Sequence, residues 1–189
     1  VLTDVHLPEH CAVTAEAERQ ARQAIRRARR EDPEARIIVT GCAAQIAPDT
    51  WDAMPEVDHV VGNHDKLAPP VWRSLAAGGE AVIVSDVMQV RETATHMLDA
   101  FSAHTRGFLQ IQQGCDHRCT FCIIPYGRGN NRSAGLGQIV ESAGQLVDGG
   151  CAEIVLTGVD ITSWGSDLPG RPRLGDLVTG LLRALPGLQ

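Results

Sequence analysis

Residues 113–125 read Gln-Gly-Cys-Asp-His-Arg-Cys-Thr-Phe-Cys-Ile-Ile-Pro and contain three of the six cysteines of this 189-residue chain. Cys115, Cys119 and Cys122 have C-x3-C-x2-C spacing, so a tight loop can bring their sulfurs onto one soft metal centre. Iron–sulfur clusters usually take four cysteines, but the next cysteine along the chain is Cys151. The run therefore predicts a cluster with three protein ligands and one open iron, where chemistry can take place.

A zinc site and a disulfide framework are the alternatives for this run. Structural zinc sites usually have two separated ligand pairs. Here His117 is the nearest candidate fourth ligand, and a single residue separates it from Cys115, which is cramped for a tetrahedron. Six cysteines in 189 residues is a far lower cysteine content than that of small, disulfide-rich secreted domains. The pattern favours an iron–sulfur cluster, and a zinc site remains the alternative.

Composition predicts an ordinary globular chain with one large or two small domains, since 43% of residues are hydrophobic and 21% charged. The chain has no apolar run of roughly eighteen residues and no signal-peptide pattern, so we expect no membrane contact. Exposed thiols fit a reducing cytoplasm. The net charge of −6 argues against an extended nucleic-acid surface, leaving local patches such as Arg118, Arg128 and Arg132.

The first half of the chain alternates helices with buried strands. A helix is predicted from the N-cap Thr14 to about Arg30. Apolar runs predict strands at 35–40, 57–62 and 81–84, with a helical segment at 67–77. This order is typical of a parallel α/β layer. Cys11 precedes a helix and Cys42 follows a strand, so both are expected at the carboxyl edge of the sheet, where such sheets bind ligands.

The second half predicts two β/α units of a barrel, whose active site would lie on the loops after the strands. The expected elements are strands 108–112 and 153–157, and helices 136–147 and 174–185. We therefore divide the chain into an N-terminal domain (1–90), a linker (91–106) and a barrel part (107–189). Two units cannot close a barrel, so we expect a fragment cut at both ends.

Three motifs resemble the methylthiotransferases of the radical S-adenosylmethionine superfamily. Cys11-Ala-Val-Thr-Ala-Glu-Ala17 and Val39-Thr-Gly-Cys-Ala-Ala-Gln45 are similar to their N-terminal domain. Gly114 to Gly129, followed by Asn131-Arg-Ser133, is similar to their radical domain. Leu156-Thr-Gly-Val-Asp-Ile-Thr162, with Asp167-Leu-Pro-Gly170, resembles the branch that methylthiolates threonylcarbamoyl-adenosine beside the anticodon of tRNA.

The resemblance implies a set of cofactors and ligands. Cys115, Cys119 and Cys122 would bind a 4Fe–4S cluster whose open iron holds S-adenosylmethionine. Phe121 would lie against the adenine of this cofactor, with plain packing as the alternative. The loop with Thr157, Gly158 and Asp160 would contact its methionine part. Cys11 and Cys42 would hold a second 4Fe–4S cluster, whose first family cysteine would precede Val1.

The implied activity is replacement of a C–H bond at C2 of the base by C–S–CH3. Its partners would be the tRNA anticodon loop and an electron donor such as a flavodoxin or ferredoxin. Two alternatives stay open: a family member that acts on an aspartate of a ribosomal protein, and a zinc-stabilised binding module without catalysis. Because the barrel is unfinished, we expect the fragment alone to be inactive.

Overall fold

The computed structural model describes residues 14–91 and 106–188, which form two compact units. The first unit comprises residues 14–90 together with 117–129, and the second comprises the remaining described residues. Cys11 and most of the expected linker lie outside the described residues. The two units are described one at a time.

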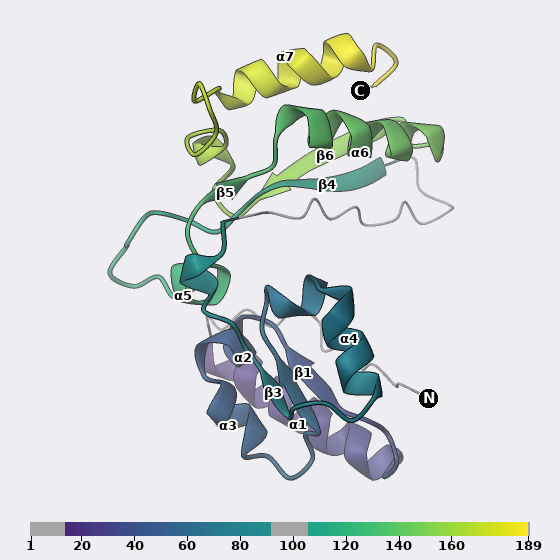
Figure 1. Ribbon diagram of the computed structural model, residues 1–189, viewed down its shortest axis with the longest axis vertical. Helices are drawn as coiled ribbons and strands as arrows, with labels where there is room; N and C mark the ends of the chain where they lie inside the picture. Colours follow the sequence, from purple (N-terminus) through teal and green to yellow (C-terminus); the bar gives the residue numbers. More distant parts are fainter. Residues whose placement is uncertain (1–13, 92–105, 189) are drawn as a thin grey trace. The chain divides into compact units, whose positions relative to one another are not determined.

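The first unit contains a parallel three-stranded sheet (Figure 1). Its strands are β1 (Ile38–Thr40), β2 (His59–Val61) and β3 (Val82–Ile83), in the order β1-β2-β3. Its longer helices are α1 (Ala15–Glu31) and α4 (Pro69–Ala76). Shorter elements are α2 (Cys42–Ile46), α3 (Pro48–Asp52), α5 (Ile124–Arg128) and the 3-10 turns η1 (Asp65–Leu67) and η2 (Val87–Gln89). The predicted parallel α/β layer is confirmed.

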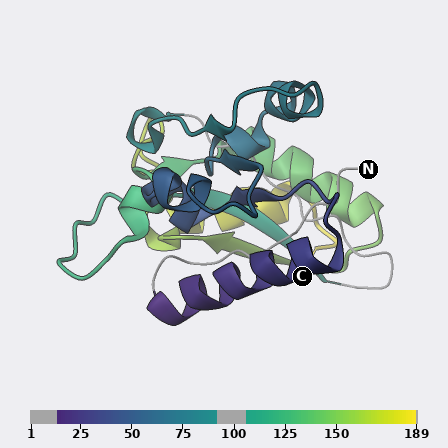
Figure 2. The ribbon, with the colours of Figure 1, turned by 90° about the horizontal axis from the view of Figure 1, so that it is seen from below.

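Alternating strand residues place helices on both faces of this sheet. Val39 and Val60 pack with Ile25 of α1 in one hydrophobic cluster. Val61, the next residue along β2, packs with Leu75 of α4 in another. Successive side chains of a strand point to opposite faces, so α1 and α4 cover opposite sides of the strands, as Figure 2 shows.

Helix α1 begins where the sequence predicts. The Thr14 hydroxyl accepts a hydrogen bond from the Ala17 backbone N–H at 3.2 Å, which satisfies one of the free donors of the first turn. Ala21 and Ile25 form its buried stripe. The arginines elsewhere on this helix are exposed or half-buried, as expected for its solvent side.

The second unit contains two successive β/α units. β4 (Arg106–Gln113) and β6 (Glu153–Gly158) are parallel neighbours, and the short β5 (Arg132–Ser133) pairs antiparallel with β4. Helices α6 (Leu136–Asp148) and α7 (Leu174–Ala184) follow β4 and β6 and lie on one side of both strands (Figure 1). A 3-10 turn, η3 (Ile161–Ser163), follows β6. The chain thus contains the opening part of a β/α barrel, as predicted.

The two faces of β4 have different surroundings. Leu109 and Ile111 are fully buried in the hydrophobic core formed with α6 and α7. Phe108, which alternates with them, is 45% exposed. Gln110 lies on this second face, and the pairing with β6 becomes irregular between Gln110 and Gln112. In β/α barrels the face away from the helices turns toward the barrel interior, so Phe108 and Gln110 occupy the interior face of the partial barrel.

Within the described residues, every helix is too short or too polar to span a membrane.

The turn after Trp164 requires glycine, which gives a test of the second unit. Gly165 has φ of 88°, and a Cβ there would collide with the Pro172 carbonyl oxygen. We expect Gly165→Ala to lower the free energy of unfolding by about 2 kcal/mol or more. Gly144→Ala, on α6 with nothing within 4 Å, should raise it by up to about 1 kcal/mol. Equal denaturation midpoints for the two variants would contradict this reading of the turn.

Candidate metal centre

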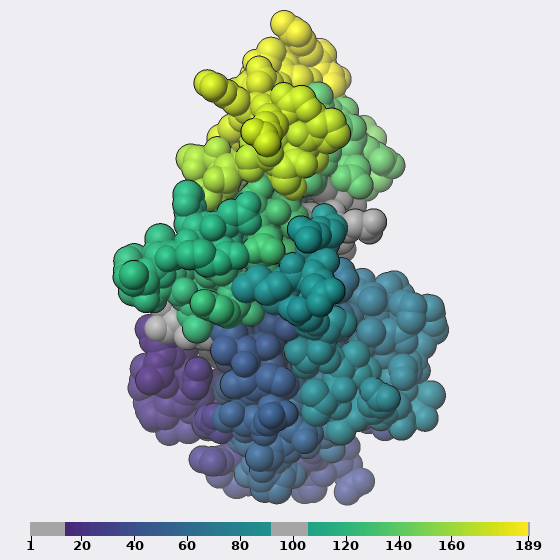
Figure 3. Space-filling model, turned by 60° about the vertical axis from the view of Figure 1, so that its left-hand side comes forward, coloured from purple at the N-terminus to yellow at the C-terminus, as the bar shows by residue number. Residues whose placement is uncertain are grey.

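The cysteine run begins directly after β4. Gly114 has φ of 74°, a left-handed conformation that suits glycine and turns the chain out of the strand. Cys115 and Cys122 are half-buried and Cys119 is exposed. The Cys122 backbone N–H donates to the Cys119 carbonyl oxygen at 3.0 Å, which closes a turn between these two residues. Figure 3 shows the green-teal segment that carries them at the molecular surface.

The thiols of the run have the soft-donor chemistry that iron–sulfur clusters use. All three are free, and each is at least partly accessible. Of the other cysteines among the described residues, Cys151 is 4% exposed and lies in the hydrophobic core of the second unit. Cys42 is 3% exposed within the first unit. Neither stands in the loop as a fourth ligand, so the loop itself offers three soft donors.

The loop after β6 lies beside the first cysteine of the run. Cys115 Sγ is 3.9 Å from Asp160 Oδ2. Asp160 is held by hydroxyl donors from its own loop, Ser163 Oγ at 2.6 Å and Thr162 Oγ1 at 2.9 Å. Two of the predicted site residues, Cys115 and Asp160, are therefore neighbours although 45 positions separate them.

Gln112 connects this loop to the start of the cysteine run. Its Nε2 donates to the Gly114 carbonyl oxygen at 2.7 Å and to Asn131 Oδ1 at 2.6 Å. Its Oε1 accepts from the Asp160 backbone N–H at 2.8 Å. Gly158 packs so closely that an added Cβ would lie 2.8 Å from Gln112 Oε1. The fully buried Gln112 thus ties the ends of both strands together.

Asn131 extends the same network. Its backbone N–H donates to Asp116 Oδ1 at 2.9 Å, and its Nδ2 donates to Ser166 Oγ and Asp167 Oδ1, both at 3.0 Å. Arg132 follows in the chain and is 6% exposed. Burial lowers the pKa of the Arg132 guanidinium, and the Asp167 carboxylate opposes that shift. The segment after α5 is therefore fastened to the loop that follows β6.

Thr157 and Gly158 occupy the carboxyl end of β6, at the edge where the sequence predicts cofactor contacts. Thr157 is half-buried and Gly158 is exposed. Phe121, in the first unit, is 91% exposed. It takes no part in a hydrophobic core of the described residues.

Cys42 is the first residue of α2 and follows Gly41, whose φ is 112°. Its sulfur accepts hydrogen bonds from Arg128 Nε at 3.0 Å and from Asn63 Nδ2 at 3.4 Å. Gly127 packs directly against it. A buried sulfur with two N–H donors suits a metal-ligating cysteine. Cys11, its expected partner, lies outside the described residues.

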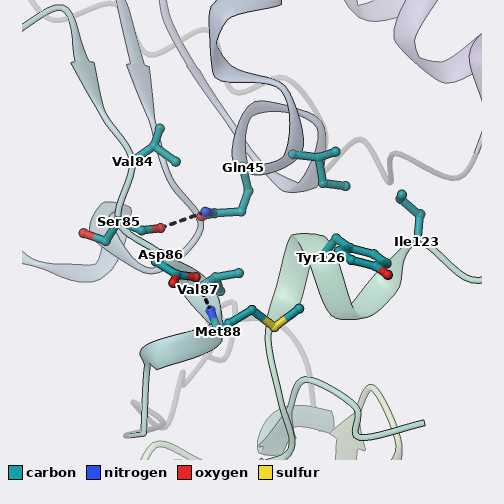
Figure 4. Close-up of a pocket in the computed structure, with 9 residues that line it drawn as sticks. Gln45, Val84, Ser85, Asp86, Val87, Met88, Ile123 and Tyr126 are labelled. Carbon is teal, nitrogen blue, oxygen red and sulfur yellow. Dashed lines mark hydrogen bonds between the residues drawn. The ribbon is translucent and has the colours of Figure 1, made fainter. Parts of the chain in front are cut away.

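A hollow of about 570 Å³ opens near the carboxyl end of β3 in the first unit (Figure 4). Its walls combine α2, the segment after β3, the N-cap residue Ile123 of α5, and the half-exposed Tyr126 of α5 itself. Gln45 Nε2 donates to the Ser85 carbonyl oxygen at 2.9 Å, so this wall is internally bonded. Helix α5 thus forms one side of the hollow.

Family models match both halves of the chain. Residues 2–62 match the uncharacterised protein family UPF0004, and residues 109–179 match the radical SAM superfamily. The threonylcarbamoyladenosine tRNA methylthiotransferase MtaB of Rickettsia prowazekii is 46% identical over the whole chain. The chain belongs to the radical S-adenosylmethionine methylthiotransferases.

Other methylthiotransferases are similar over less of the chain. MtaB of Bacillus subtilis is 41% identical over 87% of the chain and 37% of its own length. The ribosomal protein uS12 methylthiotransferase RimO of Myxococcus xanthus is 37% identical over 78% of the chain and 31% of its own length. The chain spans 44% of the length of the Rickettsia relative.

A solved structure supports the fold. The radical S-adenosylmethionine methyltransferase TsrM of Kitasatospora setae aligns with a TM-score of 0.57 at 16% identity. The match covers 92% of this chain and 38% of that enzyme. At this identity the likeness concerns the fold alone.

Sequence reasoning gave no individual role to Gln112, Asn131 or Asn63. The position of Gln112 carried a usable signal, because an amide stands in the predicted strand two residues before Gly114-Cys115. Asn131 stands in the Asn131-Arg-Ser133 motif, but the sequence gave no sign of its hydrogen bonds or of those of Asn63, since their partners are distant in the sequence.

Two glutamines of β4, Gln112 and Gln110, allow a controlled test of the network. Gln112→Leu would leave the Asp160 N–H and Asn131 Oδ1 without their buried partner, so we expect a loss of about 2–4 kcal/mol in the free energy of unfolding. Gln110 Nε2 is buried without a hydrogen-bond partner among the described residues. Gln110→Leu should therefore be neutral or stabilising in denaturant unfolding. A similar loss in both variants would show that the hydrogen bonds of Gln112 contribute little.

Proposed function

We propose that this chain is part of a tRNA methylthiotransferase that converts threonylcarbamoyl-adenosine next to the anticodon to its 2-methylthio derivative. The observation that carries the proposal is the run of three accessible thiols whose first member, Cys115, adjoins Asp160. The similarity to MtaB enzymes from several bacteria supports the choice of substrate.

Cys115, Cys119 and Cys122 would hold a 4Fe–4S cluster, and the open iron would take S-adenosylmethionine. When bound, this pair supplies one-electron chemistry that can exchange a C–H bond for a C–S bond. The chain's own residues bind and orient the cofactor and exclude water.

Each predicted cofactor contact has a matching physical property. The Asp160 carboxylate is an acceptor suited to the ammonium group of the methionine part. Gly158 is exposed at the end of β6, so a ligand can reach its backbone. Thr157 offers a hydroxyl at the same strand end. The exposed ring of Phe121 offers a face for the adenine.

Cys11 and Cys42 would serve a second 4Fe–4S cluster that provides the sulfur to be inserted. The donors around Cys42 Sγ support its role as a ligand.

The tRNA anticodon loop is the proposed partner, since unstacked loop bases can be splayed out and enclosed by a protein. A flavodoxin or ferredoxin would supply the electron. An enzyme with accessible thiols that acts on tRNA would work in the cytoplasm. The RimO similarity makes a ribosomal-protein aspartate the second candidate substrate.

Anaerobic reconstitution with iron and sulfide tests the metal. We expect Cys119→Ala to lose about four iron atoms and the corresponding brown absorbance relative to the unsubstituted protein. Cys151→Ala is the matched control, because Cys151 lies in a hydrophobic core, and it should keep its iron. Stoichiometric zinc without colour would support the non-catalytic module instead.

The substrate is tested with the full-length enzyme under reducing, oxygen-free conditions. We expect methylthiolation of an anticodon stem-loop that carries threonylcarbamoyl-adenosine, detected by mass spectrometry of the nucleosides. The ribosomal protein should stay unmodified in the parallel reaction. Modification of the protein alone would reverse the assignment.

A further inference from the structure

Three neighbours converge on the sulfur of Cys42 within the first unit. The guanidinium Nε of Arg128 lies 3.0 Å from Sγ and the amide Nδ2 of Asn63 lies 3.4 Å from it. Gly127 is so close to the same cysteine that an added Cβ would lie 2.8 Å from its Cβ and 3.3 Å from its Sγ. Cys42 is 3% exposed, so these contacts lie in a site shielded from water.

Hydrogen bonds from both the backbone and the side chain hold Asn63 in place. The Asn63 backbone N–H donates to Gln45 Oε1 at 2.9 Å, and the side-chain Nδ2 also donates to the Gly127 carbonyl oxygen at 2.7 Å. One amide therefore connects the sulfur of Cys42 to the backbone of α5. Asn63 is 8% exposed, and losing either bond would leave a buried polar group unpaired.

The close approach of α5 depends on glycine at position 127. A Cβ there would lie 2.8 Å from the Cβ of Cys42, closer than real Cβ atoms come. The absence of a side chain lets α5 sit directly on Cys42. The next residue, Arg128, then reaches the sulfur with its Nε.

These contacts predict an effect on a metal bound through Cys42. Hydrogen bonds to the sulfurs of an iron–sulfur cluster are among the features that set its reduction potential. A donor from a cationic group is stronger than a neutral one. Burial also strengthens the bond electrostatically. The positive charge of Arg128 favours the reduced, more negative state of such a cluster.

We propose that Arg128 and Asn63 are positioning residues for the second cluster, which fix the Cys42 sulfur and raise the reduction potential of the metal it binds. This inference rests on the proposed role of Cys42 as a cluster ligand. It gives a role to Arg128, in the segment after the cysteine run, for which the family motifs name no role.

The test uses the full-length enzyme with Cys115, Cys119 and Cys122 replaced by Ala, so that only the second cluster can assemble. Iron is quantified first, and the midpoint potential is then measured by a redox titration followed by electron paramagnetic resonance. The variants are Arg128→Gln, Arg128→Lys and Asn63→Leu. Arg118→Gln is the matched control, because it removes the same charge from an exposed position of the same segment.

We expect Arg128→Gln to lower the ratio of reduced to oxidised cluster at a fixed potential about tenfold, a shift of about 59 mV for one electron. Arg128→Lys should shift it less, since the charge stays, and Asn63→Leu should shift it in the same direction. Arg118→Gln should leave it unchanged. A midpoint for Arg128→Gln equal to that of the Arg118→Gln control would overturn the inference.

A second measurement needs no substitution at Arg128. The protein is labelled with 15N-arginine, and the reduced second cluster is studied by pulsed electron paramagnetic resonance. We expect a hyperfine coupling to a nearby nitrogen that is typical of 14N in unlabelled protein and of 15N in labelled protein. An unchanged spectrum would overturn the inference even if Arg128→Gln loses its iron. A triple cysteine variant without iron would instead refute the second cluster itself, and the role of Arg128 with it.

Discussion

The side-chain amide of Gln112 is the constraint on which the site of the second unit depends. It is fully buried, and it donates toward the start of the cysteine run while it accepts from the backbone of Asp160. A buried amide without hydrogen-bond partners would cost free energy. The hydrogen bonds of Gln112 therefore favour the arrangement in which the two strand ends lie together. The neighbouring Gly158 leaves space for that amide and for no side chain of its own.

The two sets of cysteines have opposite surroundings, and this difference suits different tasks. The thiols of residues 115–122 are accessible to some degree, as a centre that must admit a cofactor requires. Cys42 is buried beneath α5, and N–H donors surround its sulfur. Buried, hydrogen-bonded sulfur suits a metal whose properties the protein controls.

The segment 117–129 links the chemistry of the cysteine run to the first unit. It follows Cys115 directly in the chain, yet α5 belongs to the first unit and packs on α2. A close approach of backbones at Gly127 makes this packing possible. Residues of a radical-domain motif therefore contribute to the surroundings of a cysteine of the N-terminal motif.

The sequence by itself determined the features that local rules govern. The cysteine spacing indicated the metal, Thr14 marked the start of α1, and alternating apolar runs indicated both parallel layers. It missed α5 and β5, because elements of five and two residues are too short for a periodic pattern. Tertiary structure alone decided that Gln112 meets Asp160 and that Arg128 meets Cys42, since 48 and 86 positions separate these partners. Hydrogen bonds between residues so far apart leave no periodic trace in a single sequence; they arise only when packing brings the strand ends and helices together.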